Sequence, residues 1–197
     1  MSYHNALLIF SHTPKIDRSR SDSAFATLPW EELDSLFTAI IGDFVKNASG
    51  MVNVDILLYR NPQELSDDFF LPYRQRIQLF DLTNAPLTDQ VCTAVENTFH
   101  LGYQNVVIIL DNNPLISRAL LRKTFTQLGY EDDCIVVGPT IEGKCYLIGM
   151  KMDHSRIFDS TEGDPINKSS LLIKNICSLE SMLFLLNPVN SLDSTDN

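Results

Sequence analysis

Two short polar segments contain the residues of this sequence whose types could do chemistry. The first, residues 111–114 (DNNP), follows a very apolar run, and the second is a turn at Glu142 and Gly143. Polar residues directly after buried strands are candidates for ligand binding in an α/β fold. A plain helix cap is the alternative for the first segment. A hairpin turn with a positive φ at Gly143 is the alternative for the second.

Strands and helices alternate along the chain, and these elements must position the two polar segments. Apolar runs predict strands and three- to four-residue apolar spacing predicts helices. Expected strands are residues 5–10, 52–59, 77–82, 106–110, 134–137 and 145–150, and expected helices are 31–46, 87–101, 113–129 and 170–186, followed by a polar tail from Asn187. This order predicts an α/β fold with three layers, α/β/α, around a mostly parallel sheet. Such sheets bind ligands at the carboxyl ends of their strands, where both segments lie.

Composition limits the possible partners. The 197 residues, 44% hydrophobic and 20% charged, favour a single globular domain spanning 1–197. The formal net charge of -10 argues against a nucleic-acid partner, since a phosphate backbone would be repelled. No run of eighteen apolar residues occurs, so we expect no membrane partner and a cytoplasmic location. The four cysteines lack metal-ligand spacing, which argues against zinc. The sequence does not indicate an oligomeric state.

Two stretches resemble a bacterial family of small glycosyltransferase-like proteins with the nucleotide-diphospho-sugar transferase (GT-A) fold. Residues 106–121 read VVIILDNNPLISRALL and residues 135–149 read IVVGPTIEGKCYLIG. The family patterns are VVLIGTDCP for the first and GPxxDGGYYLIG for the second, and both match without gaps. Residues 6–14 and 192–194 resemble the family's amino-terminal strand and loop and its closing aspartate-containing turn. The resemblance implies a nucleotide-diphospho-sugar transferase-like domain.

The resemblance implies a nucleotide and metal site that is partly lost. The family aspartate expected to help hold the metal and the diphosphate is replaced by Asn112, with Asp111 one position earlier. Asp111 and Asp193 are the implied metal ligands, and any Mg²⁺ or Mn²⁺ site is expected to be weak or absent. Two unit charges 4 Å apart interact by roughly 4 kcal/mol at an effective dielectric constant of 20, and a divalent ion doubles that energy. The implied nucleotide-binding residues are Pro14, Arg18, Arg20, Asp111 and Asn112.

The remaining implied residues belong to the second matched stretch and to one further motif. The resemblance implies a substrate pocket at Glu142, Gly143 and Tyr146, where Glu142 replaces the family aspartate with a longer carboxylate side chain. The family motif GDLGERM is replaced by APLTDQV at residues 85–91, which removes both glycines and the arginine.

Two functions from different classes follow from these departures. The sequence favours a pseudoenzyme that binds a nucleotide-sugar or acts as a scaffold, with the fold kept and the metal-dependent step lost. The alternative is an active metal-dependent glycosyltransferase or nucleotidyltransferase that uses a nucleotide-diphosphate donor. An unrelated flavodoxin-like domain would require the matched motifs to be coincidental.

Overall fold

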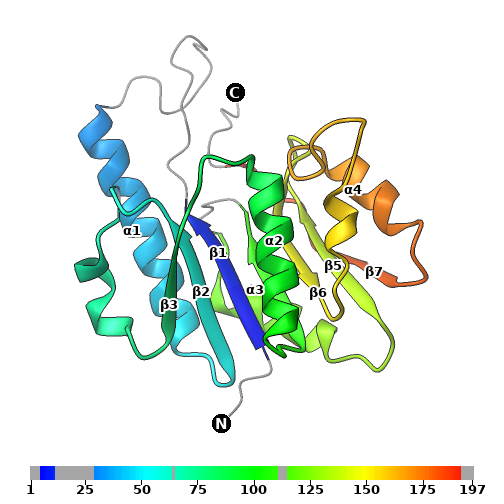
Figure 1. Cartoon of the computed structure of the whole chain (residues 1–197), viewed down its shortest axis with the longest axis horizontal. Helices are drawn as coiled ribbons and strands as arrows, with labels where there is room; N and C mark the ends of the chain where they lie inside the picture. Colours follow the sequence, from blue (N-terminus) through cyan, green and yellow to red (C-terminus); the bar gives the residue numbers. More distant parts are fainter. Residues whose placement is uncertain (1–4, 12–28, 64, 111–114, 192–197) are drawn as a thin grey trace.

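A seven-stranded sheet forms the centre of the molecule. The computed structural model describes residues 5–11, 29–63, 65–110 and 115–191. In this part of the chain the strand order is β3-β2-β1-β4-β6-β5-β7, and only β6 runs antiparallel to its neighbours. The strands are β1 (Asn5–Ser11), β2 (Val54–Arg60), β3 (Ile77–Asp81), β4 (Asn105–Ile109), β5 (Cys134–Pro139), β6 (Cys145–Met150) and β7 (Met182–Leu185) (Figure 1). A flavodoxin-like sheet has the order 2-1-3-4-5, so that alternative is excluded.

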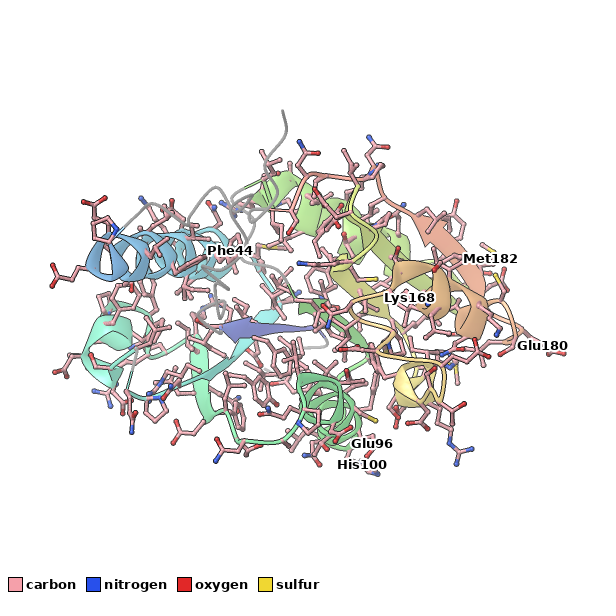
Figure 2. The ribbon with its side chains drawn as sticks, turned by 90° about the horizontal axis from the view of Figure 1, so that it is seen from above. Phe44, Glu96, His100, Lys168, Glu180 and Met182 are labelled. Carbon is pink, nitrogen blue, oxygen red and sulfur yellow. The ribbon has the colours of Figure 1, made fainter. Side chains whose placement is uncertain are left out.

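Helices cover both faces of this sheet, which confirms the expected three layers. α1 (Trp30–Ser49) and α3 (Arg118–Leu128) pack on one face, and α2 (Leu87–His100) and α4 (Ser169–Ile176) pack on the other (Figure 2). Two short 3-10 helices, η1 (Asp67–Tyr73) and η2 (Ser155–Phe158), complete the layers. None of the described helices is long and apolar enough to cross a membrane.

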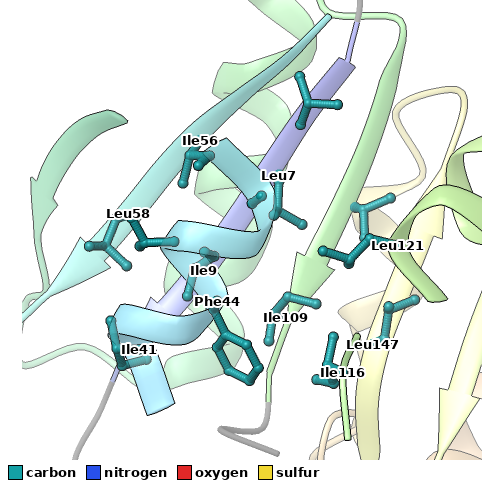
Figure 3. Close-up of a cluster of buried hydrophobic side chains, with 14 of the residues drawn as sticks. Leu7, Ile9, Ile41, Phe44, Ile56, Leu58, Ile109, Ile116, Leu121 and Leu147 are labelled. Carbon is teal, nitrogen blue, oxygen red and sulfur yellow. The ribbon is translucent and has the colours of Figure 1, made fainter. Parts of the chain in front are cut away.

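Strand β1 shows why the central strands are apolar on both faces. Its side chains alternate, so Leu7 and Ile9 contact the α1 layer while Leu8 and Phe10 contact the α2 layer. Figure 3 shows the first of these clusters, in which Leu7 and Ile9 lie beside residues such as Phe44 of α1. A strand buried on both sides reads as a continuous apolar run, which is why the sequence identified it.

The expected start of the third helix is wrong. Residues 113–129 were expected to be helical from Asn113 and Pro114, but α3 begins at Arg118. Ser117 is the N-cap, with extended backbone and a side chain that accepts a hydrogen bond from the Leu120 amide at 3.3 Å. Serine and asparagine are comparable N-cap residues, so residue type alone does not rank the two possible starts. The capping alternative for residues 111–114 concerns residues outside the described part of the chain and stays a prediction.

The expected final helix, residues 170–186, is also wrong because it contains two elements. α4 ends at Ile176, and β7 pairs in parallel with β5 from Met182 to Leu185. The Asn175 side chain donates to the carbonyl of Ile157 at 2.8 Å, which ties the end of α4 to η2. The open edge of β5 supplies a hydrogen-bonding partner for the following apolar residues, and this tertiary pairing overrides their helical spacing.

The residues after β7 are not a free tail as far as Ser191. Leu186 donates its amide to Val137 at 2.9 Å, and Val189 forms a parallel bridge with Thr140. We call residues 186–191 the C-terminal strap. It lies against the hairpin formed by β5 and β6, at the carboxyl end of β5.

Candidate functional site

The carboxyl ends of β1, β2, β3, β4 and β5 meet at one edge of the sheet, which we call the carboxyl edge. The last residues of β1, β2 and β3 are neighbours in register, Ser11 beside Arg60 and Arg60 beside Asp81. Leu110, which directly precedes Asp111, donates its amide to Tyr146 of β6 at 3.0 Å. The two matched stretches are therefore adjacent at the edge where a sheet of this type binds ligands.

Several sequence-predicted residues lie outside the described part of the chain. They are Pro14, Arg18, Arg20, Asp111, Asn112 and Asp193. Their roles in nucleotide or metal binding stay predictions. The described residues that flank them, Ser11, Leu110 and Ser191, all lie at the carboxyl edge.

Glu142 and Gly143 form the turn of the β5–β6 hairpin. This agrees with the hairpin-turn alternative that the sequence offered for these two residues. Gly143 has a φ of +86°, a conformation that favours glycine. Its carbonyl accepts from the Ser169 amide at the start of α4, at 2.6 Å. The Glu142 side chain points toward the strap, where Oε2 accepts from the Ser191 amide at 3.0 Å. The pocket role of both residues stays a prediction.

Tyr146 is a core residue in this structure. Only 1% of it is exposed, and its hydroxyl donates to the carbonyl of Asn187 in the strap at 3.3 Å. Burial raises the pKa of Tyr146 to about 12, so the phenol stays protonated at neutral pH. Its ring packs directly over Gly138 of β5. Whether Tyr146 also contacts a substrate stays a prediction.

Arg60 is a charged residue at the carboxyl edge that the sequence did not single out. It is 5% exposed, pairs with Asp67 of η1, and has a nitrogen 3.8 Å from Asp81. Two carboxylates thus neutralise this guanidinium, so it offers little net positive charge to a phosphate. An arginine directly after an apolar strand was the available signal, but the expected strand stopped at Tyr59.

Gln90 lies in the first turn of α2, at the position where the sequence comparison indicated the loss of an arginine. Its side-chain oxygen accepts from the Thr83 amide at 2.8 Å, and its nitrogen donates to the carbonyls of Thr83 at 3.2 Å and Ala85 at 2.8 Å. The carboxamide therefore fixes the loop after β3. The sequence indicated the loss of an arginine, but only the fold shows which groups Gln90 binds.

An aromatic row and a cavity lie beside this loop. Phe10, Tyr59 and Phe80 stack across three adjacent strands, with ring centroids 4.6 and 4.9 Å apart. Tyr59 and Phe80 line a cavity of about 330 Å³ between the sheet and α2, which also borders Thr83 and Gln90. Burial raises the pKa of Tyr59 to about 12. The site combines flat apolar surfaces with a few polar groups, as small-molecule sites do.

A second, more polar cavity lies away from the carboxyl edge. It has a volume of about 520 Å³ and is bordered by Glu96 and His100 of α2 and by η2 (Figure 2). His154, read from the sequence as an isolated histidine, lies 2.8 Å from Asp133 and also borders this cavity. Among the described residues, no group of three His, Cys, Asp or Glu side chains has the arrangement of a metal site.

Solved structures of related fold cover nearly the whole chain. A protein of Desulfovibrio desulfuricans G20 named as a nucleotide-diphospho-sugar transferase is 18% identical, with a TM-score of 0.77 over 98% of this chain and 84% of that chain. 4-Diphosphocytidyl-2C-methyl-D-erythritol synthase from Anaerococcus prevotii is 10% identical, with a TM-score of 0.59 over 92% and 86%. A manganese-bound Mycobacterium tuberculosis H37Rv protein is 12% identical, with a TM-score of 0.51 over 100% and 95%. The protein thus has the nucleotide-diphospho-sugar transferase fold.

A family model matches more than half of the chain. Residues 44–162, more than half of the 197, match the family described as "Uncharacterized protein conserved in bacteria (DUF2064)". The chain belongs to this family, which confirms the resemblance to a bacterial family with the nucleotide-diphospho-sugar transferase fold. No curated protein matches the sequence.

Proposed function

We propose that this protein is a pseudoenzyme that binds a nucleotide-sugar, or serves as a scaffold, and that has lost the metal-dependent transfer step. The observation that carries the proposal is Gln90. The position that holds an arginine in the family carries an uncharged side chain, and all three of its hydrogen bonds go to the backbone of the adjacent loop. Arginine suits phosphate groups because its fixed fork of donors carries a full charge, and Gln90 has neither property.

Ligand binding is supported by a cavity that begins at the carboxyl edge and runs along α2 to Leu101. The cavity beside Tyr59 and Phe80 has apolar walls and polar groups at the loop that Gln90 holds. A planar ring, such as the base of a nucleotide, fits against stacked aromatic side chains through apolar and π contacts. Holding a base or a sugar in this way does not require the cations and carboxylates that a diphosphate and a metal need. We place this function in the cytoplasm, where the free thiols of the four cysteines are stable.

An active glycosyltransferase or nucleotidyltransferase is the second candidate. It is favoured by the position of the strap, because Ser191 lies beside Glu142 at the carboxyl edge and Asp193 follows two residues later in the sequence. With Asp111 following Leu110, two carboxylates would be available for Mg²⁺ or Mn²⁺. The manganese-bound neighbour supports this metal class as a proposal.

Calorimetric titration distinguishes the two candidates. We expect saturable binding of a nucleotide or nucleotide-sugar whose dissociation constant changes less than about threefold when 5 mM Mg²⁺ or Mn²⁺ is added at constant ionic strength. Tight binding only with the metal would refute the pseudoenzyme and favour the enzyme. No binding under any condition would contradict nucleotide binding by either candidate and leave the scaffold role.

The variant Asn112→Asp should raise the affinity for Mn²⁺ by about tenfold or more, because it returns a carboxylate to the family's metal position. The measurement is Mn²⁺ titration followed by electron paramagnetic resonance of the free ion. Asn113→Asp is the matched control, since it adds the same charge one residue away. Equal gains in both variants would mean that the added charge attracts Mn²⁺ without a defined site.

A further inference from the structure

The C-terminal strap is attached to the β5–β6 hairpin by a series of specific contacts. Ile141 donates its amide to Val189 at 2.9 Å, and Val189 donates to Pro139 at 3.3 Å. The last contact in this series uses a side chain, because Oε2 of Glu142 accepts from the Ser191 amide at 3.0 Å. The strap is thus held by backbone pairing in its middle and by Glu142 at its end.

The hairpin itself is fixed from the opposite side. The carbonyl of Gly143 accepts from the Ser169 amide, and the Cys145 amide donates to Ile166 at 3.0 Å. Within the turn, Thr140 exchanges hydrogen bonds with Lys144 through its amide at 2.8 Å and its hydroxyl at 3.1 Å. The turn is thus bonded both internally and to the segment that leads into α4. Glu142 connects the strap to a part of the hairpin that other bonds already hold.

We infer that Glu142 is a positioning residue that holds the strap at the carboxyl edge, and that its carboxylate is not a ligand-binding group. This inference rests on the proposed nucleotide-sugar-binding function for its consequence on affinity. The proposed base cavity lies beside β2 and β3, and the strap lies farther along the same carboxyl edge, at β5, toward which the sugar part of such a ligand would extend. An aspartate at this position would have a side chain one methylene shorter, so the Ser191 contact depends on the reach of the glutamate.

Reach and charge can be separated by substitution. If Glu142 holds the strap, the essential property is an oxygen acceptor at the end of a side chain of this length. Glu142→Gln keeps that oxygen and removes the charge, whereas Glu142→Asp keeps the charge and shortens the arm. If Glu142 instead bound a cation or a ligand directly, charge would be essential, and Glu142→Asp would be the milder change. If Glu142 holds the strap, Glu142→Asp is the more harmful variant. If Glu142 binds a cation or a ligand, Glu142→Gln is the more harmful one.

The test combines hydrogen exchange of the Ser191 amide, followed by NMR, with nucleotide titration of the full chain. We expect Glu142→Gln to keep the exchange protection and the nucleotide affinity within about threefold of wild type, since an amide oxygen also accepts from an amide. Glu142→Asp should lower the protection of Ser191 by about tenfold or more and weaken nucleotide binding in parallel. Glu131→Gln and Glu131→Asp are matched controls at an exposed position before β5 and should change neither measurement.

Two results would overturn the inference. Full Ser191 protection in Glu142→Asp would show that the longer side chain is not needed, and loss of nucleotide affinity in Glu142→Gln with intact protection would make the carboxylate a ligand-binding group. If the wild type binds no nucleotide, nucleotide binding fails as the proposed function, while the exchange measurement still decides whether Glu142 holds the strap.

Discussion

Gly138→Ala is expected to lower the free energy of unfolding by about 3 kcal/mol, at the upper end of the usual range for overpacking. A Cβ atom at Gly138 would overlap Cζ of Tyr146 and lie within 2.8 Å of two further ring atoms. The ring cannot move away easily, because Tyr146 is 1% exposed and its hydroxyl is bonded to the strap. Urea denaturation followed by circular dichroism measures the change.

Gly42→Ala is the control for this prediction. Gly42 lies within α1, and its nearest neighbour would be the partly exposed ring of Phe69 at 3.1 Å, which can shift. Alanine is the better helix former by up to about 1 kcal/mol, so the substitution should be neutral or stabilising. If Gly138→Ala is as well tolerated as Gly42→Ala, the Tyr146 ring does not occupy the position described here.

The protein is expected to lose stability steeply above pH 9. Burial, together with the nearby Asp164, raises the pKa of the Cys145 thiol from 9.0 to about 12. Above pH 9 the unfolded chain therefore releases a proton that the folded chain retains, so stability is full below pH 9 and falls as the pH rises toward 12. This single group removes about 3 kcal/mol by pH 11, and Tyr146, raised from 10.0 to about 12 by burial, removes about 1 kcal/mol more.

Variants of the cysteines test the origin of this alkaline loss. Cys145→Ala should reduce the decrease in unfolding free energy between pH 8.5 and pH 11 by about 3 kcal/mol, whatever its stability at pH 8.5. Cys177→Ala, which removes an exposed thiol after α4, should leave the decrease unchanged. Urea denaturation at a series of pH values measures the decrease in unfolding free energy for each variant. An undiminished pH dependence in Cys145→Ala would mean that other groups cause the loss.

Much of the sheet could be predicted from the sequence because its strands are buried on both faces. Continuous apolar runs such as Leu7 to Phe10 have no other stable location in a protein of this size. β7 was missed because its four residues are partly exposed, and their short apolar pattern suits a helix as well as a strand. The start of α3 was missed because two capping signals lie close together and local sequence does not rank them.

The candidate site was only partly predictable. The positive φ of Gly143 and the hairpin around it followed from local turn chemistry. The partners of Glu142, Gln90 and Arg60 did not follow, because each bond joins residues from different elements. Tyr146 lies in a motif that the sequence matched. Its burial depends on contacts with the strap and with Gly138, and a sequence motif does not show such contacts.

Residue order alone was enough to identify the class of fold, the family and the two matched stretches, which the described Leu110–Tyr146 bond makes adjacent at the carboxyl edge. These features depend on local apolar periodicity and on residue identities at fixed spacing, which are properties of the chain alone. Only the folded chain shows that two aspartates neutralise Arg60, that Gln90 binds the loop after β3, and that Glu142 holds the strap. Long side chains bind whichever groups the packing of distant elements brings within about 3 Å, so their roles are fixed only when the chain has folded.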